Sequence, residues 1–385
     1  MKTIYLNNNA TTKVDKAVLE EMRLFYAEVY SNLGVPRLFN AQVQQKVSEA
    51  RERVAALLGA LLEEIIFSAS GTESSYAAIY SAIGMFPEKR HIITSKVEHR
   101  GMLSIFHDLA KKGYKITEIG VDYNGCLDIE AYKQAIDNDT VIVSFMWANN
   151  ETGVIFPVEE AAAIAKDKGV LFHTDAVQAV GKIPVCMAKS QIDMLSLSGH
   201  KIYAPMGVGA LYLRRETVFS PYIKDEYQEK NGNTCLDNIA LIIALGKACE
   251  LAGQYIDIEN GYVKSLRNQL QKELMLKIPF VRVNGGRAAR LPNTLSIAFD
   301  CVETNAILKC LSEVSIYASS GIPCTGDHVG VSHVLQAMSV PSSCIQGVVH
   351  FSLCRKTTIE DIKTVACEVP PIITKLRSIS ALTGS

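Results

Sequence analysis

Short apolar segments alternate with longer amphipathic ones up to about Ser220. The short segments predict β-strands at Glu64–Phe67, His91–Thr94, Tyr114–Ile119, Val141–Trp147, Val170–Thr174, Met194–Leu197 and Val208–Leu213. The longer segments carry apolar residues at helical spacing and predict helices at Val14–Val29, Ala41–Leu58, Thr72–Met85, Arg100–Lys112 and Val158–Lys168. Strands that alternate with helices in this way predict an α/β fold, with a mainly parallel sheet flanked by helices.

The pattern changes after Ser220, because a polar stretch from Lys224 to Thr234 interrupts it. Two further helices are predicted near Asp237–Ala252 and Gly261–Leu276. The chain from Phe280 onward predicts a smaller α+β domain, with strands at Thr294–Phe299 and Val348–Leu353 and a last helix that starts near Ile359.

Composition narrows the classes of protein that fit this pattern. A chain of 385 residues is long enough for two domains, and its 39 Lys and Arg balance its 40 Asp and Glu. That balance gives no electrostatic reason to expect nucleic-acid or membrane binding. The N-terminus has no signal-peptide pattern, so we expect a cytoplasmic protein. The 10 cysteines include no C-x-x-C pair, and we expect neither a disulfide framework nor a metal site.

A lysine that follows a strand gives the strongest chemical signal. The strand Met194–Leu197 runs directly into Ser198-Gly199-His200-Lys201. Ligands of open α/β sheets bind beyond the carboxyl ends of the strands, and a lysine there can form an imine with an aldehyde cofactor. Taken alone, Lys201 is more often a solvated loop residue.

Residues at the end of a second strand favour the imine-forming interpretation of Lys201 over the solvated one. The strand Val170–Thr174 is followed by Asp175, with Gln178 close behind. A carboxylate at such a place needs a partner, and a pyridinium nitrogen is one, because the carboxylate keeps that nitrogen protonated. The alternative is that Asp175 caps the next helix.

Three more strands are followed by residues that suit a flat, phosphorylated cofactor. Ser70-Gly71-Thr72 opens a helix, where backbone N–H groups can bind phosphate. His99 can stack on a ring and move protons. Asn149-Asn150 can orient a ring hydroxyl or a carboxylate. Each segment also has a plainer explanation, as a helix cap, a structural histidine or a turn.

The five segments together resemble the fold-type I enzymes that use pyridoxal 5'-phosphate (PLP), in the class V aminotransferase group, and within it the cysteine desulfurases of the NifS/IscS type. The resemblance runs from about Ile4 to about Asp361. Its most specific parts are His173-Thr174-Asp175-Ala176-Val177-Gln178, with Gly181-Lys182, and Ser198-Gly199-His200-Lys201-Ile202-Tyr203.

The resemblance implies a role for each of these residues. Lys201 would hold PLP covalently, Asp175 would pair with its ring nitrogen, and His99 would stack on the ring and move protons. The remaining residues implied to bind the cofactor are Gly71, Thr72, Asn150, Gln178, Ser198, His200 and, across a dimer interface, Thr234. It also implies a large PLP-binding domain over residues 14–255, and a small domain made of residues 1–13 and 256–385.

Two segments of the small domain would decide the reaction. Phe351-Ser352-Leu353-Cys354-Arg355 resembles the family segment whose arginine binds the substrate α-carboxylate, with Asn150 and Asn8 as further substrate contacts. Cys324 falls where the family carries a nucleophilic cysteine on a loop. The implied reaction removes sulfur from L-cysteine, giving L-alanine and a persulfide on Cys324.

The resemblance also has gaps that keep other functions open. Residues Ile223 to Thr234 depart from the family's His-Gly-Gly-Gly-Gln-Glu run, and Ile322-Pro323 replaces small residues before Cys324. An aminotransferase or selenocysteine lyase would need Lys201 and Asp175 but not Cys324. A scaffold protein that has lost the chemistry is a third possibility.

The implied partners follow from the implied reaction. They are L-cysteine, a second copy of the chain, and a protein that accepts sulfur. Iron–sulfur cluster assembly, tRNA thiolation and DNA sulfur modification would each supply such an acceptor.

Overall fold

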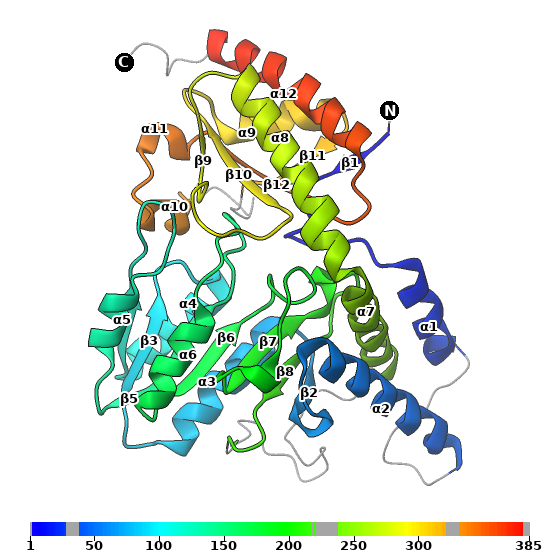
Figure 1. Cartoon of the computed structure of the whole chain (residues 1–385), viewed down its shortest axis with the longest axis vertical. Coiled ribbons are helices and arrows are strands. Elements are labelled where there is room, and N and C mark those ends of the chain that lie inside the picture. The colour runs from blue at the N-terminus through cyan, green and yellow to red at the C-terminus, as the bar shows by residue number, and fades with distance from the viewer. Residues whose placement is uncertain (1, 28–37, 218, 220–237, 321–330, 380–385) are drawn as a thin grey trace.

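A computed structural model describes residues 2–27, 38–217, 219, 238–320 and 331–379. Its central element is a seven-stranded sheet of order β2-β8-β7-β6-β5-β3-β4 (Figure 1). Strands β3 to β7 pair in parallel, whereas β8 is antiparallel to both of its neighbours. The strands are β2 (Ile65–Ser68), β3 (His91–Ser95), β4 (Lys115–Ile119), β5 (Thr140–Met146), β6 (Leu171–Asp175), β7 (Met194–Ser198) and β8 (Gly209–Leu213).

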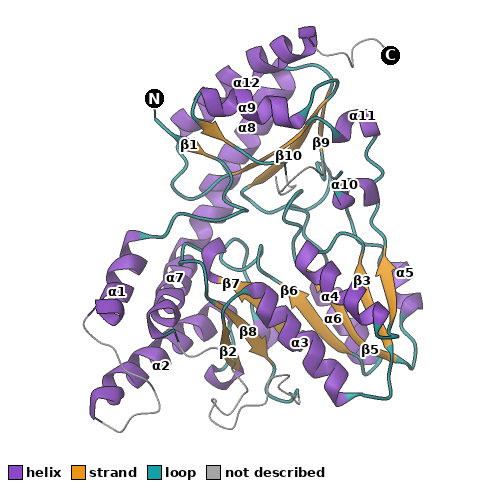
Figure 2. Cartoon of the chain, turned by 180° about the vertical axis from the view of Figure 1, so that it is seen from behind, coloured by secondary structure: helices purple, strands orange, loops and turns teal. Residues whose placement is uncertain are grey.

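Helices cover both faces of this sheet, because its strands are apolar on both sides. Ile92 and Ile142 pack on one face with α3 (Gly71–Met85) and α4 (Arg100–Lys111). Ile93 and Val143 point to the other face. The helices on that side include α1 (Lys16–Ala27), α2 (Leu38–Leu58), α6 (Val158–Asp167) and α7 (Ile239–Ile258) (Figure 2). The short α5 (Ile129–Ala135) follows β4. The predicted α/β fold is confirmed.

A smaller unit lies at the end of α7 (Figure 1). One π-helical turn, Glu259–Val263, joins α7 to α8, so the helix predicted from Gly261 begins its regular part three residues later. This unit holds the antiparallel sheet β12-β10-β9 and the parallel pair β1-β11. Its elements are α8 (Lys264–Lys277), β9 (Val281–Val283), β10 (Thr294–Phe299), α9 (Thr304–Glu313), β11 (Ile316–Tyr317), α10 (His333–Ala337), α11 (Ser342–Ile345), β12 (Val348–Ser352), α12 (Ile359–Ile379) and, from the N-terminus, β1 (Ile4–Tyr5).

The N-terminal strand belongs to the core of this smaller unit. Ile4 and Leu6 pack with α8, α9, α12 and strands β10 and β12. The last helix starts as its sequence predicts, because Thr358 and Asp361 cap it reciprocally. The Asp361 N–H donates to Thr358 Oγ1 at 3.2 Å, and the Thr358 N–H donates to Asp361 Oδ2 at 3.0 Å. The exact domain boundaries, 14–255 against 1–13 with 256–385, stay a prediction.

One helical stretch, Ile239–Lys277, is long and apolar enough to cross a membrane by length and composition alone. Of its most apolar window, 67% is buried inside the protein. Its close packing on α2 accounts for this burial: a Cβ on Gly246 would lie 2.5 Å from Ala50 Cα, so only glycine lets the two helices approach so closely. Ile239–Lys277 therefore has the properties of a core helix.

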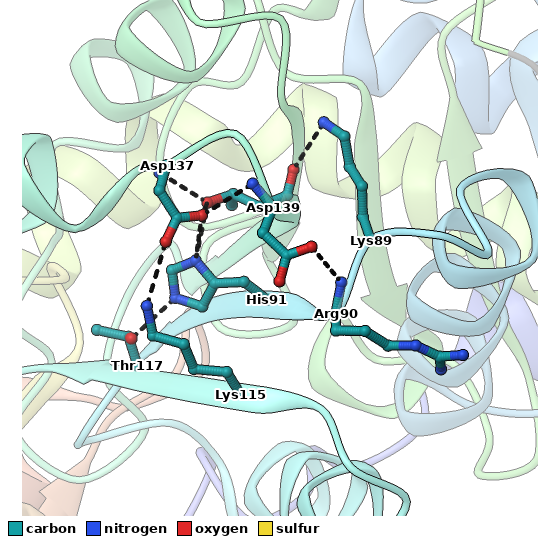
Figure 3. Close-up of polar contacts among 8 residues, drawn as sticks. Lys89, Arg90, His91, Lys115, Thr117, Asp137 and Asp139 are labelled. Atoms are coloured by element: carbon teal, nitrogen blue, oxygen red, sulfur yellow. Dashed lines mark hydrogen bonds and ion pairs between the residues drawn. The ribbon is translucent and has the colours of Figure 1, made fainter.

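A cluster of polar side chains connects neighbouring strands at the edge of the sheet where the parallel strands begin (Figure 3). His91 is fully buried at the start of β3. Its Nδ1 lies 2.9 Å from Thr140 Oγ1 and 3.1 Å from Asp137 Oδ1, and its Nε2 lies 2.8 Å from Thr117 Oγ1. The cluster therefore joins β3, β4 and β5 away from the strands' carboxyl ends.

Replacing His91 with alanine should destabilise the fold by about 1 to 3 kcal/mol, because buried hydroxyl groups lose their partner. Urea unfolding monitored by circular dichroism measures this loss. Lys111→Ala is a suitable control, since it removes only an exposed pair with Asp108 and should cost less than about 0.5 kcal/mol. Equal unfolding midpoints for His91→Ala and the wild type would show that the cluster contributes nothing.

Candidate active site

The structure contains a cavity of about 630 Å³ between the sheet and the smaller unit. The carboxyl ends of β2, β5, β6 and β7 meet at this edge of the sheet, as they do where ligands bind to open α/β sheets. The residues that line the cavity are Asn7, Asn9, Ala10, Ser70, Gly71, Thr72, His99, Met146, Ala148, Asn150, Asp175, Val177, Gln178, Ser198, His200, Lys201, Leu308, Ala318, Ser319, Ser320 and His350.

Most of the predicted site residues are in that set. The sheet brings together Gly71, Thr72, His99, Asn150, Asp175, Gln178, Ser198, His200 and Lys201, which come from segments far apart in the sequence. Parallel strands end at one edge of a sheet, so residues that follow separate strands become neighbours.

Lys201 ends a single 3₁₀ turn, Gly199–Lys201, directly after β7. Its Nζ donates hydrogen bonds to the carbonyl oxygens of Asn9 at 2.6 Å and Ala10 at 2.7 Å. Burial lowers the pKa of Lys201 to about 8, although the nearby Asp175 carboxylate opposes the shift. A lysine with such a pKa supplies a neutral amine at mildly alkaline pH, which is the form that attacks an aldehyde.

Asp175 is the last residue of β6 and is partly accessible from the cavity. Its Oδ1 accepts a hydrogen bond from the Val177 N–H at 3.0 Å. Removal from water raises the pKa of Asp175, while the Val177 bond, His99 and Lys201 oppose the shift. The carboxylate therefore stabilises the turn that follows β6; no helix starts in this described stretch, so it is not the helix cap of the alternative interpretation. It also lines the cavity, where a cationic group would stabilise it.

His99 precedes α4 and caps it, since its Nδ1 accepts a hydrogen bond from the Gly101 N–H at 3.2 Å. That bond fixes the ring, and His99 is one of the residues that line the cavity. Burial lowers the pKa of His99, and Asp175 works against this shift. A neutral imidazole of fixed orientation is suited to stacking and proton transfer.

A chain of hydrogen bonds orients the amide of Gln178. The buried Lys182 Nζ donates to Gln178 Oε1 at 2.6 Å, and Gln178 Nε2 donates to the Asn9 carbonyl at 3.0 Å. Because an ammonium or amine group donates, the amide oxygen must face Lys182, and the amide nitrogen faces the Asn9 carbonyl. Burial lowers the pKa of Lys182 to about 7.

The first turn of α3 provides a place for an anion. Ser70 caps this helix by accepting a hydrogen bond from the Glu73 N–H at 3.1 Å. Gly71 has no room for a side chain, since a Cβ there would lie 2.5 Å from Val177 Cγ2. The remaining polar groups of this end of the cavity are Thr72, Ser198 and His200. Backbone N–H groups and hydroxyls at a helix N-terminus suit a phosphate group.

The two neighbouring asparagines have different tasks. Asn149 is buried and makes a turn, because its Oδ1 accepts hydrogen bonds from the N–H groups of Glu151 and Thr152 at 3.0 and 2.9 Å. Asn150 lines the cavity. The turn interpretation is therefore confirmed for Asn149, whereas ligand binding by Asn150 stays a prediction.

These residues fit PLP by the chemistry of their groups. A lysine with a lowered pKa, a desolvated carboxylate, a stacking histidine and a helix N-terminus with hydroxyls match the aldehyde, ring nitrogen, ring face and phosphate of that cofactor. Among the described residues, no group of three or more His, Cys, Asp or Glu could hold a metal ion.

Two predicted substrate residues lie outside the lining of the cavity. Asn8 is buried beside it, with its Nδ2 donating to the Ser352 carbonyl at 2.8 Å, and its neighbours Asn7 and Asn9 line the cavity instead. Arg355 forms an ion pair with Asp15 at 2.8 Å. Its guanidinium also stacks on the rings of Tyr203 and Tyr255. Thr234 and Cys324 lie outside the described residues.

The structure adds polar residues to the cavity that the sequence did not single out, and His350 is the titratable one among them. His350 lies in the middle of β12, where Val349 and Phe351 point into the core of the smaller unit and the alternate positions point away from it. The signal in the sequence was a histidine inside an otherwise apolar strand, Val348-Val349-His350-Phe351.

Comparisons with known proteins agree with this geometry. Residues 4–365 match the model of the class-V aminotransferase family. The cysteine desulfurase NifS of Azotobacter vinelandii is 46% identical to this chain over 381 residues, which span 99% of this chain and 95% of the relative.

Solved structures show the same likeness. A NifS-like protein superposes with a TM-score of 0.91 at 34% identity, covering 97% of this chain and 100% of that one. SspA in complex with cysteine superposes with a TM-score of 0.81 at 28% identity, covering 92% of this chain and 100% of that one. The chain therefore belongs to the class-V aminotransferase family and, within it, to the cysteine desulfurases of the NifS type.

Proposed function

We propose that this protein removes sulfur from L-cysteine with PLP as its cofactor, leaving L-alanine and an enzyme-bound persulfide on Cys324. The observation that supports this most directly is the meeting of Lys201 and Asp175 at the carboxyl ends of adjacent parallel strands, both facing one cavity. The 46% identity to a cysteine desulfurase over 99% of the chain supports the choice of reaction.

PLP would be held by residues that already line the cavity. Lys201 would bind it covalently, Asp175 would pair with its ring nitrogen, and Gln178 would donate its amide N–H to the ring hydroxyl. Its phosphate would lie at the start of α3, near Thr72, Ser198 and His200. When bound, PLP withdraws electrons from the α-carbon of an amino acid joined to it.

The protein's own groups would handle the protons of this reaction. Lys201 Nζ, once freed from the cofactor, has a pKa near the working range and can accept the α-proton. His99 lines the same cavity and has a lowered pKa, so its ring can accept a proton and return it without holding it permanently. Asp175 would stabilise a proton on the ring nitrogen of bound PLP.

Cys324 would provide the nucleophile for sulfur transfer. Its thiolate sulfur attacks the substrate sulfur, a new S–S bond forms, the substrate C–S bond breaks, and the released carbon takes up a proton to become alanine. Cys324 itself lies outside the described residues, but Ser320, four positions before it, lines the cavity. This placement supports access of the cysteine to the substrate.

The persulfide would then pass to an acceptor protein. We propose that the protein acts as a cytoplasmic homodimer, with Thr234 contributing to the partner's phosphate site. An iron–sulfur scaffold, a tRNA-thiolation enzyme or a DNA-sulfur-modification protein would each suit as acceptor. In this division of labour residues 14–255 bind the cofactor, and residues 1–13 with 256–385 carry Cys324 and Arg355.

Purified holoenzyme should convert L-cysteine into alanine and, with a reductant present, sulfide. Cys324→Ala should abolish the persulfide and reduce sulfide release to background, because no thiolate is left to take the sulfur. Alanine analysis and persulfide labelling followed by peptide mapping measure both. Cys367→Ala, which removes an exposed cysteine on α12, should behave as the wild type. Undiminished sulfide release by Cys324→Ala would refute the role of this cysteine, and absence of alanine from the wild type would refute the function.

Asp175→Asn should retain PLP but lower the turnover of L-cysteine by on the order of 100-fold, since an amide cannot keep the ring nitrogen protonated. Steady-state alanine formation at matched PLP content checks this. Asp128→Asn is the paired control, because Asp128 only caps α5 and asparagine caps equally well. Turnover within two-fold of the wild type in Asp175→Asn would contradict the role of Asp175.

A further inference from the structure

A buried lysine to which the proposed reaction gives no task contacts a residue of the cofactor site. Lys182 is 5% exposed, and its Nζ donates a hydrogen bond to Gln178 Oε1 at 2.6 Å. Gln178 lines the large cavity, whereas Lys182 borders a second, smaller cavity of about 10 Å³. Removing a lysine side chain from water costs free energy unless its charge gains partners. The burial of Lys182 therefore suggests that its contact with Gln178 has a function.

The backbone on either side holds Lys182 in this place. Its N–H donates to the Ala179 carbonyl at 3.0 Å, within the turn that follows β6. Its carbonyl accepts a hydrogen bond from Asn260 Nδ2 at 3.0 Å, and Asn260 belongs to the π-helical turn that joins α7 to α8. The Lys182 backbone is thus fixed from two separate elements, which leaves its side chain directed at Gln178.

An acid at the smaller cavity can support a positive charge on Lys182. Glu259 is 3% exposed, accepts a hydrogen bond from the Tyr203 hydroxyl at 3.0 Å, and borders this cavity together with Lys182 and Lys201. Burial and the charge of Lys201 lower the pKa of Lys182 to about 7, and Glu259 opposes this shift. Burial, Lys201 and Lys182 in turn lower the pKa of His200 to about 4. Lys182 is therefore charged in a large share of the molecules near neutral pH.

The hydrogen bond to Gln178 can transmit the effect of this charge to the large cavity. A charged donor makes a stronger hydrogen bond than a neutral one, and a hydrogen bond to an amide oxygen polarises the amide, so that its N–H groups become stronger donors. One N–H of Gln178 Nε2 donates to the Asn9 carbonyl at 3.0 Å. The same nitrogen carries a second N–H, which the proposed function assigns to the ring hydroxyl of PLP.

We propose that Lys182 is a positioning residue of the cofactor site, whose charged hydrogen bond to Gln178 strengthens the amide N–H that stabilises negative charge on the ring hydroxyl oxygen of PLP. The proposal rests on the proposed function, since it takes PLP as the bound group. Lys182 acts through Gln178 and has no place in the lining of the large cavity.

The absorbance of the PLP-loaded protein tests this role without turnover. The nitrogen that joins Lys201 to PLP holds its proton with the help of the negative ring oxygen, and a strong donor to that oxygen competes for its charge and lowers the pKa of the nitrogen. Bound PLP changes colour when this proton leaves, so a pH titration gives the midpoint. Lys182→Met keeps the length of the side chain but removes the donor and the charge. It should raise the midpoint by about one pH unit, a ten-fold change in proton affinity.

Three more proteins make the result specific. Lys182→Gln offers an N–H donor without charge, so it should raise the midpoint by an intermediate amount, and it serves if the methionine variant does not fold. Gln178→Ala should raise the midpoint by itself, and adding Lys182→Met to it should change the midpoint by less than about 0.3 unit, because the two residues act as one path.

Lys247→Met is the matched control for the loss of a lysine. Lys247 is partly buried on α7 and donates to Glu250 at 2.8 Å, and neither residue borders either cavity. Its midpoint should equal that of the wild type.

An unchanged midpoint in both single Lys182 variants would overturn the proposal. A rise of equal size with and without Gln178 would also overturn it, because Lys182 would then act on the cofactor directly through space. A wild type that shows the midpoint but forms no alanine from L-cysteine would refute the proposed function alone, since the midpoints would still judge the role of Lys182. A wild type that takes up no PLP would refute both.

Discussion

The site depends on two opposite charges held at the carboxyl ends of adjacent parallel strands. Asp175 ends β6 and Lys201 follows β7, and the protein withdraws both from water. Desolvation pushes each toward its neutral form, and the charge of the other opposes that shift. Keeping such a pair away from water costs free energy when no ligand lies between the two groups. A cofactor that offers an aldehyde to the amine and a basic ring nitrogen to the acid would satisfy both groups.

The rest of the cavity supports this pair from several directions. The cap at Ser70 and the absence of a side chain at Gly71 leave the start of α3 open toward a phosphate. Lys182 fixes the amide of Gln178, and Asn9 accepts hydrogen bonds from both Gln178 and Lys201. The N-terminal segment thus belongs to the site as well as to the smaller unit. The carbonyls of Asn9 and Ala10 together accept hydrogen bonds from Lys201 and hold its side chain in place.

Residues that directly follow strands could be placed from the sequence, because parallel strands bring their carboxyl ends to one edge. Lys201, Asp175 and His99 are of this kind. The position of Arg355 could not be deduced in the same way. Its side chain is directed by Asp15 and Tyr203, and no local pattern shows that these distant residues pack against it.

The sequence also could not show which side chains within a segment face the cavity. Asn8 bonds to Ser352, whereas its neighbours Asn7 and Asn9 line the cavity. The chain turns here, with the Ala10 N–H donating to the Asn7 carbonyl at 3.1 Å, and the turn decides which of the three side chains faces the cavity. His350 was missed because all positions of β12 are buried, so the apolar pattern does not show which face meets the cavity.

The central claim is that Lys201 is the lysine that binds the cofactor. Reduction of the PLP-loaded protein with borohydride, followed by mass spectrometry of its peptides, tests this most directly. Lys182 is the natural competitor, since it is also buried and burial lowers its pKa to about 7. A phosphopyridoxyl group on Lys201 alone is the expected result. Its attachment to Lys182, or to no lysine at all, would contradict this account of the site.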